Sequence, residues 1–358
     1  MKILYVVSSL SASGPTNQLY NIINNLDSDI YTATVITLSP ESKDSRLDDF
    51  ELLNIDIKSL NLSRLAGLLL SKFKLKNLIK GIQPDLIHTQ GIRADSLLAS
   101  LKSSIPWVMT SRNFPSEDYP SKFGKLKGGL MEKQHFLAMR KCGNVVSCSE
   151  SIRKQLGSVG IQSLAIQNGV KSIKGDGSLL PFVDKLKKPV FVTVGSLIPR
   201  KNVQYLLDAI KQVDNNQQGS LLVVGDGFQK QELESRSGHN IHYVGNVSNV
   251  QDYLAASDYF ISSSLSEGLP NTVLEALVAG LPVILSNIPS HAEIEKESKG
   301  SCILFSLDEK MQLIDILNNP KRYFSDNANE DALRLGEDVF SDKSMSLKYQ
   351  NLYKELTV

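Results

Sequence analysis

Segments with the pattern of buried strands alternate with helical segments along almost the whole chain, and this alternation restricts the fold more than any other feature. Alternating strands and helices produce a parallel sheet that helices cover on its faces. The predicted strands are residues 1–7, 31–38, 55–57, 85–89, 105–110 and 144–148 in the first half, and 189–195, 221–224, 241–244, 259–262, 283–285 and 302–305 in the second. We therefore expect an α/β protein.

The length of 358 residues predicts two domains, because a single hydrophobic core rarely serves so long a chain. Residues 171–188 are rich in Gly, Ser, Lys and Pro and lack a clear period, which is typical of a linker. We predict an N-terminal domain over residues 1–170 and a C-terminal domain over 189–340. Residues 341–358 are predicted to form a helix that packs back towards the N-terminal domain.

Charge is distributed unevenly between the two halves. Residues 1–170 contain 20 Lys and Arg against 14 Asp and Glu, whereas residues 171–358 contain 19 against 24. The excess in the first half is too mild for nucleic acid; it fits an anionic partner such as a lipid diphosphate or a membrane surface, and an ordinary solvated surface equally well. The predicted helix over 65–82 sets lysines beside apolar positions, a pattern of membrane-surface helices and also of core helices with a basic outer face.

The three cysteines, Cys142, Cys148 and Cys302, show no spacing typical of a disulfide framework or a zinc site. We expect a cytoplasmic protein. The longest apolar runs are shorter than the roughly 18 residues of a membrane-spanning helix, so we expect any membrane contact to be peripheral.

Residues 264–284 contain the strongest functional signal and have the pattern loop, helix, turn, strand. Apolar residues recur at helical spacing after Pro270, which suits the start of a helix. Glu267 lies just before this start and Glu275 lies inside the helix. Carboxylates near a helix N-terminus, whose free N–H groups attract anions, suit a ligand with phosphate and hydroxyl groups, such as a nucleotide sugar.

Two further loops follow predicted strands of the first half. The small-residue loop 8–16 contains Gly14, which permits close backbone approach to a phosphate; it lacks the GxGxxG spacing of a dinucleotide site, and an ordinary strand-to-helix connection remains open. Residues 111–120 are expected to form a loop at the carboxyl end of a strand, where parallel sheets bind ligands. Asp27-Ser28-Asp29 matches a metal-binding DxD pattern, and we interpret it as a turn.

Glu267 and Glu275 form an E-x7-E motif within S-E-G-L-P-N-T-V-L-E-A-L, and this motif resembles the signature of glycosyltransferase family 4. Other segments resemble landmarks of this family in the same order along the chain: residues 168–170, 195–202, 224–227 and 243–245. The resemblance implies the GT-B fold, in which two Rossmann-like domains with parallel sheets face a central cleft. It also implies transfer with retention of anomeric configuration.

The resemblance also implies roles for individual residues. Glu267 would hold the donor sugar, Lys201 with help from Arg200 would neutralise the diphosphate as it leaves, and Glu275 would bind the ribose hydroxyls. The other donor-binding residues it implies are Gly14, Gly268, Leu269, Pro270, Asn271, Thr272, Gly245 and Val247. We expect no metal ion and no cofactor besides the donor substrate.

The chain departs from the family pattern at two places. Ser196 stands where a basic residue is frequent, so Arg200 would have to supply that charge. Ser111-Arg112-Asn113 stands where many relatives carry a histidine near the donor sugar. Arginine is always charged and suits a phosphate or an acidic sugar. On this acceptor or sugar side we predict Arg112, Asn113, Asp118 and His88 as candidate residues, with a structural role for His88 as the alternative.

The predicted function is a retaining glycosyltransferase that moves a sugar from a nucleotide diphosphate donor, expected to be a UDP-sugar, to a hydroxyl of a saccharide or lipid-linked saccharide. Bacterial capsule, O-antigen or exopolysaccharide synthesis at the cytoplasmic face of the inner membrane is the expected setting. Two alternatives remain open: a nucleotide-sugar epimerase or phosphorylase on the same fold, and a non-catalytic GT-B subunit that binds a partner.

Overall fold

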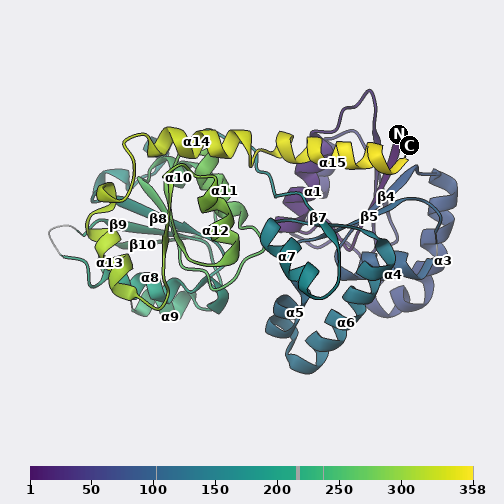
Figure 1. Cartoon of the computed structure of the whole chain (residues 1–358), viewed down its shortest axis with the longest axis horizontal. Helices are drawn as coiled ribbons and strands as arrows, with labels where there is room; N and C mark the ends of the chain where they lie inside the picture. Colours follow the sequence, from purple (N-terminus) through teal and green to yellow (C-terminus); the bar gives the residue numbers. More distant parts are fainter. Residues whose placement is uncertain (102, 215–217, 237, 358) are drawn as a thin grey trace. The chain divides into compact units, whose positions relative to one another are not determined.

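The chain divides into two compact units in a computed structural model that describes residues 1–101, 103–214, 218–236 and 238–357. Unit 1 comprises Met1–Gly169 and Asp342–Val358, and unit 2 comprises Val170–Ser341. Each unit contains a parallel sheet flanked by helices (Figure 1). Val358, the last residue of the predicted C-terminal helix, lies outside the described residues.

Unit 1 is built on a seven-stranded sheet with the order β3-β2-β1-β4-β5-β6-β7. Its strands are β1 Lys2–Val7, β2 Thr32–Thr37, β3 Asp56–Ser59, β4 Leu86–Gln90, β5 Trp107–Ser111, β6 Asn144–Ser147 and β7 Ser163–Ala165. The central strand β1 is buried on both faces, as a parallel strand between helices must be. Ile3, Tyr5 and Val7 enter one hydrophobic cluster, and Leu4 and Val6 enter the other.

Helices cover both faces of this sheet and include the C-terminal segment. They are α1 Gly14–Asn24, α2 Leu47–Glu51, α3 Arg64–Ile82, α4 Ile92–Leu101, α5 Pro115–Phe123, α6 Lys125–Cys142, α7 Glu150–Ser158 and α15 Asp342–Thr357. Helix α15 lies beside α1 (Figure 1), and it buries Met345, Tyr349 and Tyr353 in the same cluster as Tyr5. The last helix of the chain therefore completes the core of the first unit.

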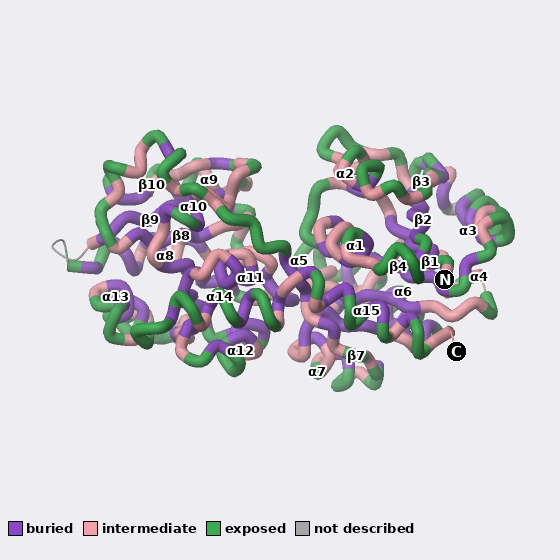
Figure 2. Tube along the Cα trace, turned by 90° about the horizontal axis from the view of Figure 1, so that it is seen from above, coloured by how far each residue is buried: buried purple, intermediate pink, exposed green. Residues whose placement is uncertain are grey.

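Unit 2 is built on a six-stranded parallel sheet with the order β10-β9-β8-β11-β12-β13. The strands are β8 Val190–Val194, β9 Ser220–Val224, β10 Ile241–Gly245, β11 Tyr259–Ser262, β12 Val283–Ser286 and β13 Cys302–Phe305. The α-helices are α8 Val203–Ile210, α9 Lys230–Ser235, α10 Val250–Ala255, α11 Asn271–Val278, α12 Pro289–Lys296, α13 Lys310–Asn318 and α14 Ala328–Asp338. Figure 2 shows buried residues along the strands of both units and exposed residues on the outer loops.

The segment expected to be a linker, residues 171–188, belongs to unit 2 instead. It contains the short 3-10 helices η1 Gly177–Leu179 and η2 Val183–Lys185. A Cβ atom added at Gly177 would lie 2.7 Å from the backbone of Ala256, and the ring of Phe182 stacks on His242. The glycines of this segment predict a flexible linker, but Gly177 allows the chain to pack closely against the end of α10.

Two helices of unit 1 differ from the prediction. Helix α4 was not anticipated, and α5 occupies residues expected to be a loop. Pro115 lies in the first turn of α5, where proline is well tolerated, whereas Pro120 lies inside the helix and gave the sequence its loop-like pattern. In the described part of the chain, no helix combines the length and apolar character needed to cross a membrane.

Candidate active site

Three glycine-containing loops meet at the carboxyl ends of the central strands of unit 2. The Gly195 N–H donates to the Val224 carbonyl at 2.9 Å, and the Gly225 N–H donates to the Gly245 carbonyl at 2.8 Å. Gly225 has φ of +139°, and a Cβ atom there would lie 2.0 Å from the Gly195 carbonyl oxygen. Only glycine permits this conformation and this approach. The loops therefore form a compact floor at the binding edge of the sheet.

Glu267 lies beside this floor in an ion-pair cluster. Its carboxylate contacts Lys201 Nζ at 2.8 Å and Arg200 Nη1 at 2.5 Å, and accepts a hydrogen bond from the Ser264 hydroxyl at 2.9 Å. The short 3-10 helix η3, Pro199–Lys201, supplies both cations. The Leu265 N–H also donates to the Arg200 carbonyl at 2.8 Å, so the loops that carry the three charges are tied together.

The charges around Glu267 determine its ionisation. The side chain is only 8% exposed, and burial alone would raise its pKa. The positive charges of Lys201 and Arg200 outweigh burial and hold the pKa of Glu267 at about 2. Glu267 is therefore a fixed carboxylate with two permanent cationic neighbours, an arrangement that can bind hydroxyl and phosphate groups together.

Glu275 has the opposite electrostatic environment. It lies in the second turn of α11, and burial raises its pKa to about 7 although the charge of Lys201 opposes the shift. Among the described residues, no hydrogen bond or ion pair reaches its carboxylate. A ligand with hydroxyl groups would supply the hydrogen bonds that this half-buried carboxylate lacks.

Helix α11 begins at Asn271, directly after Pro270, as the sequence predicted. The Val273 and Leu274 N–H groups donate to the Pro270 carbonyl, and no side chain among the described residues caps the helix. Buried Leu269 anchors the preceding turn. The amide-rich start of the helix therefore follows Glu267 and Gly268 directly, and such helix starts favour anions.

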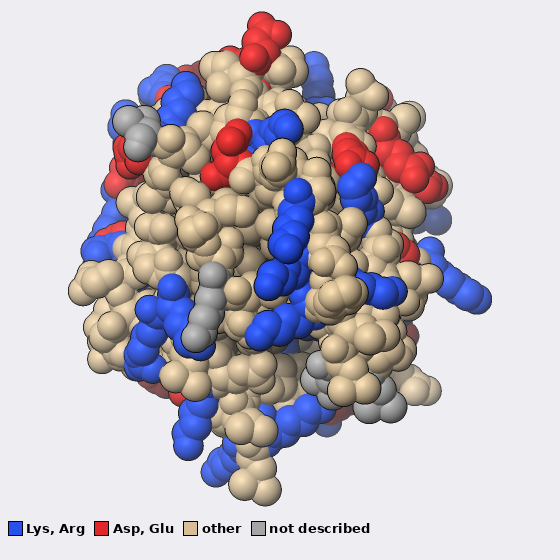
Figure 3. All heavy atoms as spheres, turned by 90° about the vertical axis from the view of Figure 1, so that its right-hand side faces the viewer, with Lys and Arg blue, Asp and Glu red and all other residues tan. Residues whose placement is uncertain are grey.

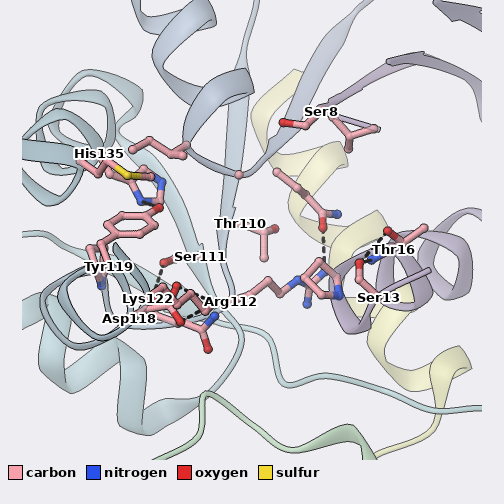
Figure 4. Close-up of a pocket in the computed structure, with 18 of the residues that line it drawn as sticks. Ser8, Ser13, Thr16, Thr110, Ser111, Arg112, Asp118, Tyr119, Lys122 and His135 are labelled. Carbon is pink, nitrogen blue, oxygen red and sulfur yellow. Dashed lines mark hydrogen bonds and ion pairs between the residues drawn. The ribbon is translucent and has the colours of Figure 1, made fainter. Parts of the chain in front are cut away.

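Unit 1 contains a separate cavity of about 380 Å³ at the carboxyl ends of its own strands. Figure 4 shows Ser13 and Thr16 of α1 on one side of this cavity, and Tyr119 and His135 of α5 and α6 on the other. Arg112, Asn113 and Asp118, which the sequence analysis predicted as acceptor- or sugar-side residues, also line it, and their role stays a prediction. The described walls combine hydroxyl groups, the basic side chains of Arg112 and Lys122, the carboxylate of Asp118 and aromatic rings, a mixture of groups that can bind a saccharide.

Both halves of the chain match glycosyltransferase families. Residues 12–172 match the model described as Glycosyltransferase Family 4, and residues 188–319 match the model described as Glycosyl transferases group 1. The chain belongs to the family 4 glycosyltransferases. Its two Rossmann-like units form the GT-B fold, as the sequence predicted.

Similarity to named glycosyltransferases and to solved structures covers most or all of this chain. The chain is 26% identical to the O-antigen biosynthesis glycosyltransferase WclY of Escherichia coli, with 99% of both chains covered. It is 29% identical to a UDP-Gal:alpha-D-GlcNAc-diphosphoundecaprenol alpha-1,3-galactosyltransferase of Escherichia coli, over 61% of this chain and 62% of the relative. Anabaena HepE, solved in complex with UDP, superposes with a TM-score of 0.80 at 19% identity, covering 99% of this chain and 100% of HepE.

The structure gathers most predicted donor residues of the glycosyltransferase at one edge of unit 2. Gly245 ends β10 with φ of +83°, and Val247 lies half-buried in the loop that follows. Ser196 is exposed, whereas Arg200 contacts Glu267. Gly14 begins α1 in unit 1, next to the N-cap residue Ser13. The ligand roles of all these residues remain predictions.

The prediction that His88 contacts a substrate is wrong for this structure. His88 is fully buried, with Nδ1 bonded to the Tyr353 hydroxyl and Nε2 to the Thr110 hydroxyl, both at 2.8 Å. Burial and the charge of Arg112 lower the pKa of His88 to about 3. A neutral histidine with both nitrogens engaged inside the core has a structural role.

The guanidinium of Arg112 lines the cavity and forms hydrogen bonds with two of its three nitrogens. Nη1 donates to the Asn168 side chain at 2.6 Å and Nη2 to the Gln90 side chain at 3.4 Å. The buried Nε atom has no hydrogen-bond partner among the described residues. Asp118, by contrast, is paired with Lys122 at 2.7 Å, so its charge is already compensated.

Sequence reasoning missed three polar residues of unit 1: Asp95, His135 and Tyr119. They are connected by hydrogen bonds although they lie on three different helices. Spacing gave no signal, because 40 residues separate Asp95 from His135.

The Asp27-Ser28-Asp29 segment forms a turn in which the Asp29 N–H donates to the Asp27 carboxylate at 3.0 Å. No cluster of three or more His, Cys, Asp or Glu suited to a metal ion occurs among the described residues.

Proposed function

We propose that this glycosyltransferase moves a sugar from a UDP-sugar to a hydroxyl of a lipid-linked saccharide, with retention of anomeric configuration, in bacterial surface polysaccharide synthesis. The observation that carries the proposal is the Glu267 carboxylate held between Lys201 and Arg200 at the binding edge of unit 2. HepE, a structural neighbour, binds UDP. The relatives are named for O-antigen synthesis and for transfer to a saccharide on diphosphoundecaprenol.

In the proposed reaction the bond between the sugar C1 and the diphosphate oxygen breaks, and a bond from C1 to the acceptor oxygen forms on the same face. The acceptor proton passes to the leaving diphosphate. Lys201 and Arg200, rather than a metal ion, neutralise the charge that develops on the leaving group, helped by the start of α11. Glu267 holds the sugar hydroxyls and Glu275 the ribose, while Gly245 and Val247 line the nucleobase and Gly14 approaches the donor.

We assign the acceptor to the cavity of unit 1. Arg112 supports this assignment because its buried Nε donor has no partner among the described residues, and a guanidinium suits the phosphate oxygens of a lipid-linked saccharide or an acidic sugar. Asn113 and Asp118 line the same cavity and would contact sugar hydroxyls.

Helix α3 supports peripheral contact with the cytoplasmic face of an anionic membrane. Leu69 and Phe73 are 82% and 67% exposed, and Lys72, Lys74 and Lys76 are exposed beside them. Figure 3 shows basic side chains spread over the face of the molecule that lies at the right of Figure 1, where α3 is labelled. Apolar and basic side chains on one helix surface bind anionic lipid by combined burial and charge attraction.

The donor reaction is tested with UDP-glucose, UDP-galactose and UDP-N-acetylglucosamine, by measuring UDP release with and without octyl glycosides as acceptors. We expect one donor to be turned over, and Glu267→Gln to abolish turnover. Glu232→Gln is the matched control, because Glu232 forms an exposed ion pair with Arg236 on α9. NMR of the product should show the anomeric configuration of the donor. Release of an epimerised sugar nucleotide, or full activity in Glu267→Gln, would contradict the proposal.

Membrane contact is tested separately by flotation with vesicles of phosphatidylcholine alone or with phosphatidylglycerol added. We expect binding only to the anionic vesicles, and a severalfold loss in Phe73→Glu. Leu52→Glu serves as the control, since Leu52 is 83% exposed but belongs to the acidic neighbourhood of α2. Equal binding of Phe73→Glu and the unaltered protein would argue against α3 as the contact.

A further inference from the structure

A hydrogen-bond chain runs through unit 1 from the core to the cavity wall. Trp107 Nε1 donates to the Thr89 hydroxyl at 2.8 Å, and that hydroxyl donates to Asp95 Oδ1 at 2.5 Å. Asp95 Oδ2 contacts His135 Nε2 at 2.9 Å, and His135 Nδ1 contacts the Tyr119 hydroxyl at 2.8 Å. Only the last two residues, His135 and Tyr119, line the cavity (Figure 4).

The chemistry of the groups gives this chain a direction. The indole N–H of Trp107 can only donate, so the Thr89 oxygen accepts there and directs its own proton to Asp95. Burial raises the pKa of Asp95, whereas its contacts with His135 and the hydrogen bond from Thr89 favour the ionised form. The distance of 2.5 Å from the Thr89 hydroxyl lies in the range of hydrogen bonds to an ionised carboxylate. The ionised Asp95 then requires the proton of His135 on Nε2. In the tautomer that has its proton on Nε2, Nδ1 carries a lone pair and accepts a hydrogen bond from the Tyr119 hydroxyl.

Tyr119 is held in place by close packing of α5 against α6. A Cβ atom added at Gly128 would lie 2.6 Å from the backbone of Tyr119 and Pro120, so α6 can approach α5 this closely only with glycine there. The Ser116 hydroxyl also donates to Glu132 at 2.6 Å across the same two helices. The position of the Tyr119 hydroxyl is therefore set before any ligand arrives.

Tyr119 is suited to bind a hydroxyl group and not to deprotonate one. Burial, together with the negative charges of Asp95 and Asp118, raises the pKa of Tyr119 far above its usual value. The phenol stays neutral and its single proton points to His135. The oxygen can then offer only lone pairs to the cavity.

We propose that Tyr119 binds the acceptor by receiving a hydrogen bond from a sugar hydroxyl, and that Asp95 and His135 are positioning residues that fix its polarity. This inference rests on the proposed function, because it takes the cavity of unit 1 as the acceptor site. It adds a specificity rule: at this point the site selects a ligand hydroxyl that donates, and disfavours an ether or carbonyl oxygen that can only accept.

The polarity is tested by NMR on the full chain labelled with 15N-histidine, without any acceptor. We expect His135 to be the neutral tautomer protonated on Nε2, with its signal assigned by its loss in His135→Gln. Asp95→Asn should move the proton to Nδ1, because the amide can donate to Nε2, and Tyr119→Phe should shift the Nδ1 resonance. A His135 protonated on Nδ1 in the unaltered protein would overturn the proposal.

The binding role is tested with the octyl glycoside that gives the fastest transfer. We expect Tyr119→Phe and Asp95→Asn each to raise the acceptor KM about 3- to 10-fold, the usual value of one hydrogen bond, with kcat nearly unchanged. The double variant should be no worse than either single variant, since both remove the same bond. An unchanged acceptor KM in Tyr119→Phe would refute the role.

Hydrolysis of the UDP-sugar without acceptor separates this inference from the proposed function. The unaltered chain should hydrolyse one UDP-sugar slowly, because the residues assigned to the donor, Glu267, Lys201 and Arg200, all belong to unit 2. If the unaltered chain hydrolyses no UDP-sugar, the proposed function fails, and the NMR result still decides the polarity of the chain. If the unaltered chain hydrolyses a UDP-sugar and Tyr119→Phe keeps the acceptor KM of the unaltered chain, the donor reaction stands and the acceptor-binding role is wrong.

Discussion

Replacing Glu275 by Gln should stabilise the protein while weakening its donor site. Burial raises the pKa of Glu275 to about 7 from the usual value of 4.5. A difference of this size corresponds to about 3 kcal/mol as an upper limit. The folded state binds the proton more tightly than the unfolded state, so the contribution of Glu275 to stability is full below pH 4.5 and is lost as the pH rises through 7. Gln has the same shape and no charge, so it avoids this loss.

The expected gain of Glu275→Gln at pH 8 is therefore about 1–3 kcal/mol, or ~2–12 °C in the melting temperature of a unit of this size. At pH 4.5 and below the two proteins should have equal stability. Thermal and urea unfolding between pH 4 and 8.5 measure the difference directly. The control Glu337→Gln, on the exposed face of α14, should change nothing at any pH. A stability difference for Glu275→Gln that did not depend on pH would refute the electrostatic reasoning.

The same experiment on Glu267→Gln should give the opposite sign. Lys201 and Arg200 hold the pKa of Glu267 at about 2, so its ionised form stabilises the fold by up to about 3 kcal/mol above pH 4.5, and this contribution is lost as the pH falls through 2. Both variants should show a smaller rise in melting temperature with UDP than the unaltered protein, since the ligand stabilises only through the sites it occupies. Stabilisation by Glu275→Gln with weaker UDP binding would mark Glu275 as a functional residue kept at the expense of stability.

The remaining predictions concern both units. Gly128→Ala should destabilise unit 1 by about 1–3 kcal/mol, because the added methyl group meets the backbone of Tyr119 and Pro120. It should also raise the acceptor KM without changing the affinity for UDP. In the control Gly129→Ala the methyl group meets nothing within 4 Å, so this variant should be neutral or stabilising. Arg112→Lys should weaken binding of a phosphate-bearing acceptor about tenfold or more in titration calorimetry, since lysine cannot reproduce the guanidinium fork. In the Lys201→Met background, the gain from Glu275→Gln should again begin near pH 4.5 but continue to grow to a higher pH, because the charge of Lys201 lowers the pKa of folded Glu275. Unfolding of the double variant across pH measures this change.

The grouping of the candidate donor residues could be predicted from the sequence because most of them lie close together in the chain. Glu267, the helix start at Pro270 and Glu275 fall within nine residues, and Lys201 follows a strand that pairs with β11 in the same sheet. Parallel strands bring such loops to one edge whatever the details of packing. The opposite pKa shifts of the two glutamates were not predictable, since they depend on which side chains surround each carboxylate.

The residues of unit 1 were harder to judge for a physical reason. The sequence predicts His88 near the end of a strand, a position typical of ligand-binding residues. In the structure it lies in the middle of β4 and is buried by Tyr353, which is 265 residues away in the sequence. Tyr119 lies in a segment with two prolines for which the sequence predicts a loop. The residues of its hydrogen-bond chain, Asp95 and His135, lie on α4 and α6. Long-range packing decides both cases, and one sequence without this packing gives no means of separating a buried histidine from an exposed one.

In the proposed donor site, the two glutamates of the E-x7-E motif would have different roles because their surroundings differ. Glu267 is ionised in advance by two cations, so a ligand that brings a diphosphate must compete with Glu267 for Lys201 and Arg200. Releasing those cations to the diphosphate leaves the Glu267 carboxylate in need of new hydrogen bonds, which the hydroxyls of a sugar can donate. The pKa of Glu275 is about 7, so part of its population is protonated at neutral pH, and hydroxyl donors would favour the ionised form. A ligand that offers diphosphate, sugar and ribose together satisfies all three demands, whereas free phosphate or a free sugar satisfies one. We therefore expect the charge balance of the candidate site to select a complete nucleotide sugar.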